Sequence, residues 1–88
     1  MNLNLFIGNK ITELRKSRNL SQEDLAFKAN IDRTYMSSIE RGKRSISLAV
    51  AIKLSSALEI SLIKLIEKEN GTYINGLDLT DRDKVFNK

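Results

Sequence analysis

Residues 20–44, LSQEDLAFKANIDRTYMSSIERGKR, predict two short helices joined by a tight turn. Ser21 is a good N-cap for the first helix, and Asp24 completes an approximate capping box with it. Asn30 tolerates the left-handed backbone that ends a helix, and Gly42 ends the second helix. Two helices with so short a link are typical of a helix-turn-helix, although an ordinary helical hairpin has the same pattern.

The second of these helices, expected at about 33–41, has an apolar side and a polar side. Met36 and Ile39 point to the core if the helix has its usual period, and the preceding Asp32 is a suitable cap. Four polar residues then fall toward the outer side: Arg33, Thr34, Ser37 and Ser38.

The sequence of this second helix resembles a known group of regulators. Residues 32–37, DRTYMS, followed by 39–42, IERG, resemble the controller proteins of restriction–modification systems. More generally, residues 7–67 resemble the lambda-repressor-like (Cro/repressor, XRE) helix-turn-helix family of bacterial and phage regulators. The resemblance implies an all-α, five-helix DNA-binding domain, and residues 70–88 lie outside it.

The composition is that of one small globular domain. The chain has 88 residues, of which 41% are hydrophobic, and a formal net charge of +4 that is compatible with a nucleic-acid partner. It contains no apolar run of about 18 residues and no basic region before an apolar core, so we expect neither a membrane span nor a signal peptide. The absence of Cys fits a reducing compartment, and the resemblance implies a cytoplasmic, nucleoid-associated bacterial protein.

The chain also contains no His. Without His and Cys, the usual zinc ligand sets and the Ser-His and Cys-His nucleophile pairs are excluded. No Gly-rich phosphate-binding loop is present. We therefore expect no enzymatic activity, no metal and no cofactor.

Residues 1–69 are expected to form one helix-turn-helix domain, and residues 70–88 a C-terminal extension of uncertain structure. Within the extension, Asn75-Gly76 is a signal for a type I′ hairpin. The apolar segment 1–6 is expected to dock on the domain or to open the first helix. Apolar periodicity predicts helices at about 7–18, 22–29, 33–41, 48–58 and 62–68.

Two of these helices have patterns that bear on packing. In the first, the basic residues Lys10, Lys16 and Arg18 lie off the apolar stripe and are expected to be solvated. In the fourth, Val50 and Leu54 broaden an apolar face. The inward positions expected from the spacing of this fourth helix are Leu48, Ala51, Ile52, Ser55 and Leu58.

Arg33 is the strongest candidate for recognising DNA sequence, because its planar guanidinium can donate twice to guanine O6 and N7 in the major groove. Thr34 can contact a base edge or a thymine methyl, while Ser38 lies further along the same face and Ser37 flanks it. For all four residues the alternative is an ordinary solvated side chain. Asp32 would repel phosphate, so it either caps the helix or accepts from a cytosine amine.

A second group is expected to contact the DNA backbone. Gln22, at the start of a helix, resembles the glutamine with which the family binds phosphate, and the helix dipole favours an anion there. Tyr35 is expected to contact phosphate or sugar, or to stack at the groove edge. Three basic residues lie just past the helix that reads DNA, where the family also binds phosphate: Arg41, Lys43 and Arg44.

The resemblance also implies a structural ion pair. In the family, an arginine late in the first helix pairs with a glutamate near the end of the helix that reads DNA, and Arg15 and Glu40 match these positions. An arginine–carboxylate fork would hold that helix at its angle. The alternative is two unrelated surface charges.

Family members bind palindromic operators as two-fold dimers, so a homodimer on double-stranded operator DNA is expected. Leu62, Ile63 and Ile66 are the candidate interface, because they lie on two sides of a short helix; the alternative is that they all belong to the core. The favoured function is a transcriptional regulator of the controller type. RNA polymerase would be a further partner for activation.

The alternative function is an antitoxin-type protein that binds DNA and whose C-terminal segment binds a partner protein. The extension carries apolar residues that suit such a contact: Tyr73, Ile74, Leu77, Leu79, Val85 and Phe86.

Overall fold

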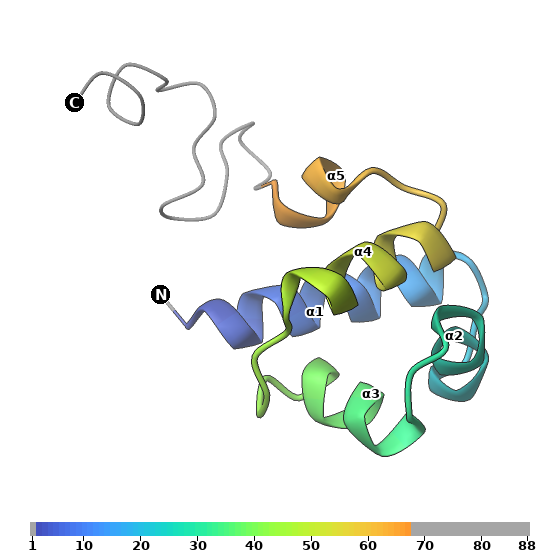
Figure 1. Ribbon diagram of the computed structural model, residues 1–88, viewed down its shortest axis with the longest axis horizontal. Coiled ribbons are helices and arrows are strands. Elements are labelled where there is room, and N and C mark those ends of the chain that lie inside the picture. The colour runs from blue at the N-terminus through green and yellow to red at the C-terminus, as the bar shows by residue number, and fades with distance from the viewer. Residues whose placement is uncertain (1, 68–88) are drawn as a thin grey trace.

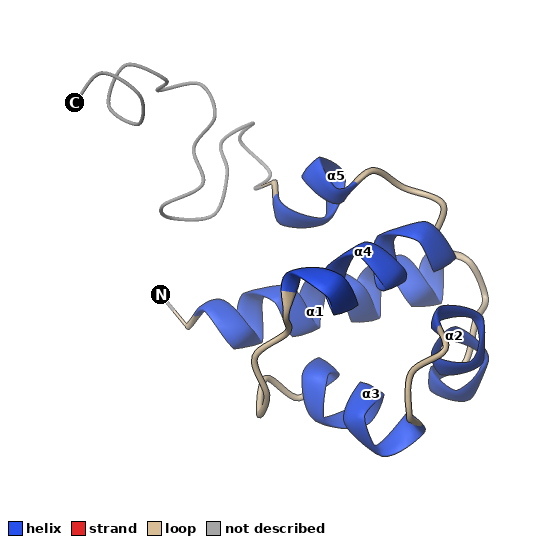
Figure 2. Ribbon diagram, viewed as in Figure 1, coloured by secondary structure: helices blue, strands red, loops and turns tan. Residues whose placement is uncertain are grey.

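The computed structural model describes residues 2–67, which form five helices (Figures 1 and 2). The expected all-α fold is confirmed for this part of the chain. None of the helices within it is long and apolar enough to cross a membrane. The extension 70–88, with its hairpin signal, lies outside the described residues. The helices are α1 (Leu3–Ser17), α2 (Gln22–Ala29), α3 (Arg33–Glu40), α4 (Leu48–Ala57) and α5 (Leu62–Ile66).

Helix α1 contacts helices on two sides of the domain. It packs against α3 and α5, while α4 packs against α2 and α5. Figure 1 shows α3 and α5 on opposite sides of α1 and α4. The core between the helices is built from seven fully buried large side chains: Ile11, Leu25, Met36, Ile39, Leu54, Leu58 and Leu65.

The local signals that bound the helices are confirmed. The Ser21 hydroxyl accepts from the Asp24 amide at 2.9 Å, and the Asp24 carboxylate accepts from the Ser21 amide at 3.0 Å, which completes the capping box. Asn30 and Gly42 have left-handed φ values of 57° and 72° where α2 and α3 end. Helix α1 starts earlier than its apolar stripe indicates, at Leu3, because an asparagine caps it there.

The expected inward face of α4 is wrong in part. Leu48 and Ile52 are 67% and 51% exposed, whereas Leu54 is fully buried. Because this helix has apolar residues on most of its sides, its period gives no unique inward direction. Leu48 and Ile52 are one turn apart and leave an apolar surface on the outside of α4.

Lys10 of α1 and Arg18, directly after α1, were expected to be solvated. Both side chains instead bind to the ends of other helices. The Arg18 Nε donates to the Leu58 carbonyl at 2.8 Å, and the Lys10 Nζ donates to the Glu67 carbonyl. These carbonyls lie at the C-terminal ends of α4 and α5, where backbone acceptors have no partner within the helix. A cation is favoured there also by the helix dipole. Arg18 and Lys10 therefore fasten α4 and α5 to α1.

A close approach of two backbones joins α1 to α3. A Cβ atom added to Gly8 would lie 2.8 Å from the Glu40 carbonyl oxygen and closer still to that of Ile39. Both neighbours are backbone atoms, which cannot move aside as a flexible side chain can. The absence of a side chain at Gly8 thus sets the distance between the two helices.

We expect Gly8→Ala to lower the free energy of unfolding by about 1–3 kcal/mol, because α1 and α3 must separate to admit the methyl group. This loss opposes the gain of about 1 kcal/mol that alanine usually brings to a helix. Urea unfolding followed by circular dichroism measures the difference. The control is Asn9→Ala at the next, exposed position. Equal effects of both changes would contradict the close approach.

Candidate nucleic-acid interface

The outer side of α3 and the first turn of α2 enclose a shallow polar hollow of about 220 Å³. Its lining contains only residues that the sequence marks as candidate DNA contacts, both base-reading and phosphate-binding. They are Gln22, Arg33, Thr34, Ser37 and Arg41.

The orientation of α3 follows from its buried side. Met36 and Ile39 are fully buried, so the residues on the opposite side of the helix face outward. Arg33 and Thr34 are exposed at the first turn, and the half-buried Ser37 lies one turn further on. The N-terminal half of α3 therefore offers a guanidinium and two hydroxyls to a ligand.

The other candidate contacts lie beside the hollow. Tyr35 is half-buried, with its hydroxyl 3.5 Å from the Ser45 carbonyl oxygen. The Arg44 guanidinium carbon lies 4.9 Å from the centre of the Tyr35 ring, which is a cation–π contact. Tyr35 therefore holds Arg44 against α3, an arrangement that the sequence did not indicate. Lys43 is exposed and Ser38 is half-buried.

Asp32 acts as the cap of α3. One of its carboxylate oxygens accepts from the amides of Thr34 and Tyr35, at 2.9 and 3.2 Å. These hydrogen bonds occupy two of the amides that a phosphate would otherwise use at this helix end. An anion bound at this helix end would therefore depend more on side chains than on backbone amides.

Behind the hollow lies the Glu40 carboxylate, which joins three helices. Arg15 of α1 donates to it from Nε at 2.7 Å and from Nη2 at 3.0 Å, in the fork geometry expected from the family resemblance. Gln22 of α2 donates its Nε2 to the same carboxylate at 3.0 Å. The side chains of Arg15 and Glu40 are only 11% and 4% exposed. The pair is thus structural and largely shielded from water.

The charge state of the pair follows from these contacts. Burial raises the pKa of the Glu40 carboxyl, but hydrogen bonds from Arg15 and Gln22 outweigh it and hold the pKa below its ordinary value of 4.5. The hydrogen bond to Glu40 raises the pKa of the Arg15 guanidinium. Both groups are therefore charged at neutral pH.

The bond between Gln22 and Glu40 was not predicted from the sequence, which points to a phosphate contact alone for Gln22. These residues are 18 positions apart, and no local pattern links them. Because an amide nitrogen has two hydrogens, Gln22 keeps one donor and its carbonyl oxygen for a ligand in the hollow. Glu40 therefore fixes the orientation of a side chain that lines the candidate interface.

We expect Arg15→Ala to cost about 3–5 kcal/mol of stability, because it leaves a buried charge without its partner. The double-mutant cycle with Glu40→Ala should show coupling at pH 7. Since the folded-state pKa of Glu40 is lowered, the stability from its charge is complete above about pH 4.5 and is lost as pH falls through the folded-state pKa. Urea unfolding over this range measures the coupling. Additive effects at pH 7 would mean that the pair contributes nothing.

Comparison with known proteins agrees with this geometry. A family model described as Helix-turn-helix (HTH_3) matches residues 11–65. The control protein C.MunI from Mycoplasma sp. is 52% identical over 66 residues, covering 70% of this chain and 89% of C.MunI. The control protein C.BamHI from Bacillus amyloliquefaciens is 43% identical over 67 residues, covering 75% of this chain and 83% of C.BamHI.

A solved structure shows the same relationship. The crystal structure of the restriction–modification controller protein C.AhdI from Aeromonas hydrophila superposes with a TM-score of 0.70 at 41% sequence identity. The match covers 72% of this chain and 96% of C.AhdI. This chain therefore belongs to the helix-turn-helix family that includes the restriction–modification controller proteins.

Proposed function

We propose that this helix-turn-helix protein is a sequence-specific transcriptional regulator, which binds a palindromic operator as a homodimer and controls a restriction–modification operon. The observation that carries the proposal is the polar hollow, where Arg33, Thr34 and Ser37 of α3 face solvent beside Gln22 of α2. Similarity to named control proteins supports the restriction–modification context.

In this proposal α3 enters the major groove and contacts bases with its first two turns. Arg33 donates two hydrogen bonds to a guanine, since its guanidinium is exposed at the first position of the helix. Thr34 and Ser37 line the same hollow and contact neighbouring base edges. Ser38, outside the hollow, contacts a base at its edge.

Phosphate contacts hold α3 in the groove and add no sequence information. Gln22 donates its second amide hydrogen to one phosphate while Glu40 holds the first. Arg41 and Lys43 supply exposed cations after α3, and Arg44 is presented by the ring of Tyr35. The polar hollow and the loop after α3 thus bind DNA on two sides of the same helix.

The homodimer is proposed to form through α5 with Leu62, Ile63 and Ile66. Leu62 and Ile66 are half-buried against the core, whereas Ile63 is 43% exposed. Because core contacts cover part of Leu62 and Ile66, Ile63 offers more of its side chain to a second subunit. Ile63 is therefore the residue of this set whose substitution tests the dimer most directly.

The proposed function has further consequences for partners and location. A regulator of transcription works with DNA in the cytoplasm, and an activating role would require contact with RNA polymerase. The antitoxin alternative depends on residues 70–88, outside the described range, and nothing in residues 2–67 favours it.

We expect Arg33→Ala to weaken binding to the cognate operator by about 1–3 kcal/mol in each half-site, because the bidentate bond to guanine is removed. Binding to an operator already mutated at that base pair should change much less. A titration by fluorescence anisotropy on both DNAs measures this difference. A uniform decrease of affinity on both DNAs would make Arg33 a phosphate contact.

Lys43→Ala provides the matched comparison within the same protein. Removing a phosphate contact should weaken both DNAs alike and lower the slope of log affinity against log salt by about one unit per contact. An unchanged slope would show that Lys43 does not touch the DNA backbone.

We expect Ile63→Asp to raise the monomer fraction and to weaken operator binding, since a charge at the interface opposes association. Helix content by circular dichroism should be retained, because Ile63 is partly exposed in the single chain. Sedimentation velocity measures the monomer fraction, and Lys53→Ala at an exposed position of α4 is the control. An unchanged dimer would place the interface elsewhere.

A further inference from the structure

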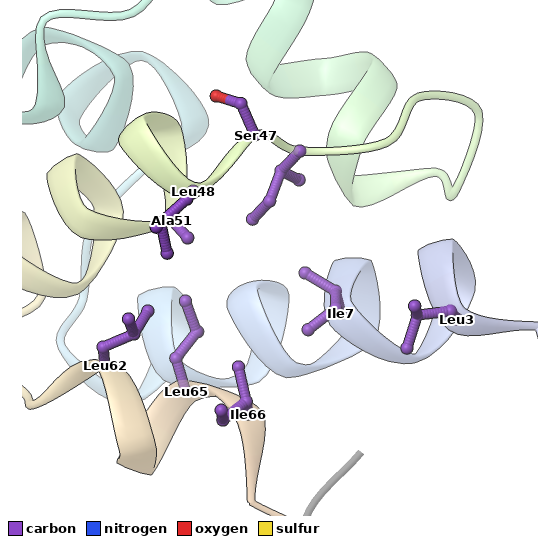
Figure 3. Close-up of a pocket in the computed structure, with 9 residues that line it drawn as sticks. Leu3, Ile7, Ser47, Leu48, Ala51, Leu62, Leu65 and Ile66 are labelled. Carbon is purple, nitrogen blue, oxygen red and sulfur yellow. The ribbon is translucent and has the colours of Figure 1, made fainter. Parts of the chain in front are cut away.

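Helices α1, α4 and α5 line an open groove of about 320 Å³ (Figure 3). Its lining is almost entirely apolar. Figure 3 shows the Ser47 hydroxyl pointing away from the other lining side chains, and this hydroxyl accepts from the Val50 amide as the cap of α4. The apolar residues that form most of the lining are Leu3, Ile7, Leu48, Leu62, Leu65 and Ile66.

This groove leaves apolar surface in contact with water. Leu48 is 67% exposed and Leu3 is 46% exposed, although each is a large aliphatic side chain. Burying apolar area is favourable by roughly 25 cal/mol per Å², so a segment that covered both side chains would be stabilised. The groove therefore favours an apolar occupant.

The chain itself leads to this groove. Ile66, the last residue of α5, lines it, and Lys10 of α1 holds the carbonyl of the next residue, Glu67. The chain thus leaves α5 at the rim, with residues 68–88 still to come. The six residues from 68 to 73 span up to about 20 Å when extended, which exceeds the length of about 15 Å of the ten-residue helix α4.

Part of the segment 68–88 is apolar enough to suit the groove. Residues 73–79, YINGLDL, contain four large apolar side chains and one charge. We propose that residues 73–79 bind in the groove between α1, α4 and α5 of the same chain. The proposal does not depend on the reading of DNA by α3, since none of these groups belongs to the nucleic-acid interface.

A segment of the same chain is favoured over a second copy by its tether. A short flexible linker gives its segment an effective concentration in the millimolar range, well above that of a free second copy in dilute solution. Of the three residues proposed for the dimer, Leu62 and Ile66 also line the groove, whereas Ile63 does not. Ile63 therefore stays available to a second subunit when the groove is occupied by residues 73–79.

The experiment measures the reactivity of single cysteines in the full chain, which contains no natural Cys. Leu48→Cys reports on the groove, and Phe27→Cys on α2, where the native side chain is 86% exposed, is the control. A segment bound about 90% of the time should slow maleimide labelling of Leu48→Cys about tenfold relative to Phe27→Cys. Equal labelling rates would overturn the proposal.

The second arm changes the segment itself. Ile74→Asp with Leu77→Asp should release it and raise the labelling rate at position 48 to that of the control cysteine. The matched pair Asp81→Ala with Asp83→Ala, outside residues 73–79, should leave the protection intact. Circular dichroism checks that each variant is folded. Protection that survives the first pair and disappears on dilution would assign the groove to a second copy instead, which also overturns the proposal.

Discussion

The interaction on which the domain depends is the bond network around the buried Glu40 carboxylate. Two bonds from Arg15 and one from Gln22 join α1, α2 and α3 at a single point. A carboxylate with these partners keeps its charge in the interior, whereas either partner alone would leave it under-satisfied. Together with the direct packing of α2 on α3, this group fixes the relative orientation of the two helices and hence the shape of the polar hollow.

The remaining contacts of α1 have the same effect by other means. Gly8 lets the backbones of α1 and α3 approach closely, and Arg18 and Lys10 bind the free carbonyls after α4 and α5. Three different kinds of interaction, namely backbone packing, an ion pair and cation–carbonyl hydrogen bonds, converge on one helix. These contacts around the core add to the limited stability that so small a hydrophobic core can supply.

The sequence predicted well whatever depends on neighbouring residues. The caps Ser21 and Asp32, and the left-handed Asn30, act within a few positions, so their patterns are visible in the chain. Contacts between distant residues were predicted only where a family resemblance supplied them, as for Arg15 and Glu40. The bond of Gln22 to Glu40 and that of Arg18 to Leu58 were missed for this reason.

In the candidate site, too, the features set by neighbouring residues were predicted and the contacts between distant residues were not. The outward face of α3 followed from the buried positions of Met36 and Ile39, but the separation of its residues into the polar hollow and its flank did not. The stacking of Arg44 on Tyr35 depends on how the loop after α3 folds back, which no periodicity describes. An inward face can be predicted only when a helix has one apolar and one polar side. Helix α4 has apolar residues on most of its sides, so its inward face could not be predicted fully.

The two sides of α3 have consequences for how this protein can change over time. The residues that fix the helix, Met36, Ile39 and Glu40, are buried, while Arg33 and Thr34 are exposed and stand apart from the core. Exchanges at exposed positions usually change stability by less than about 0.5 kcal/mol. In the proposed mode of DNA reading, operator preference can therefore diverge between lineages, or be redesigned, while the scaffold that presents these residues stays the same.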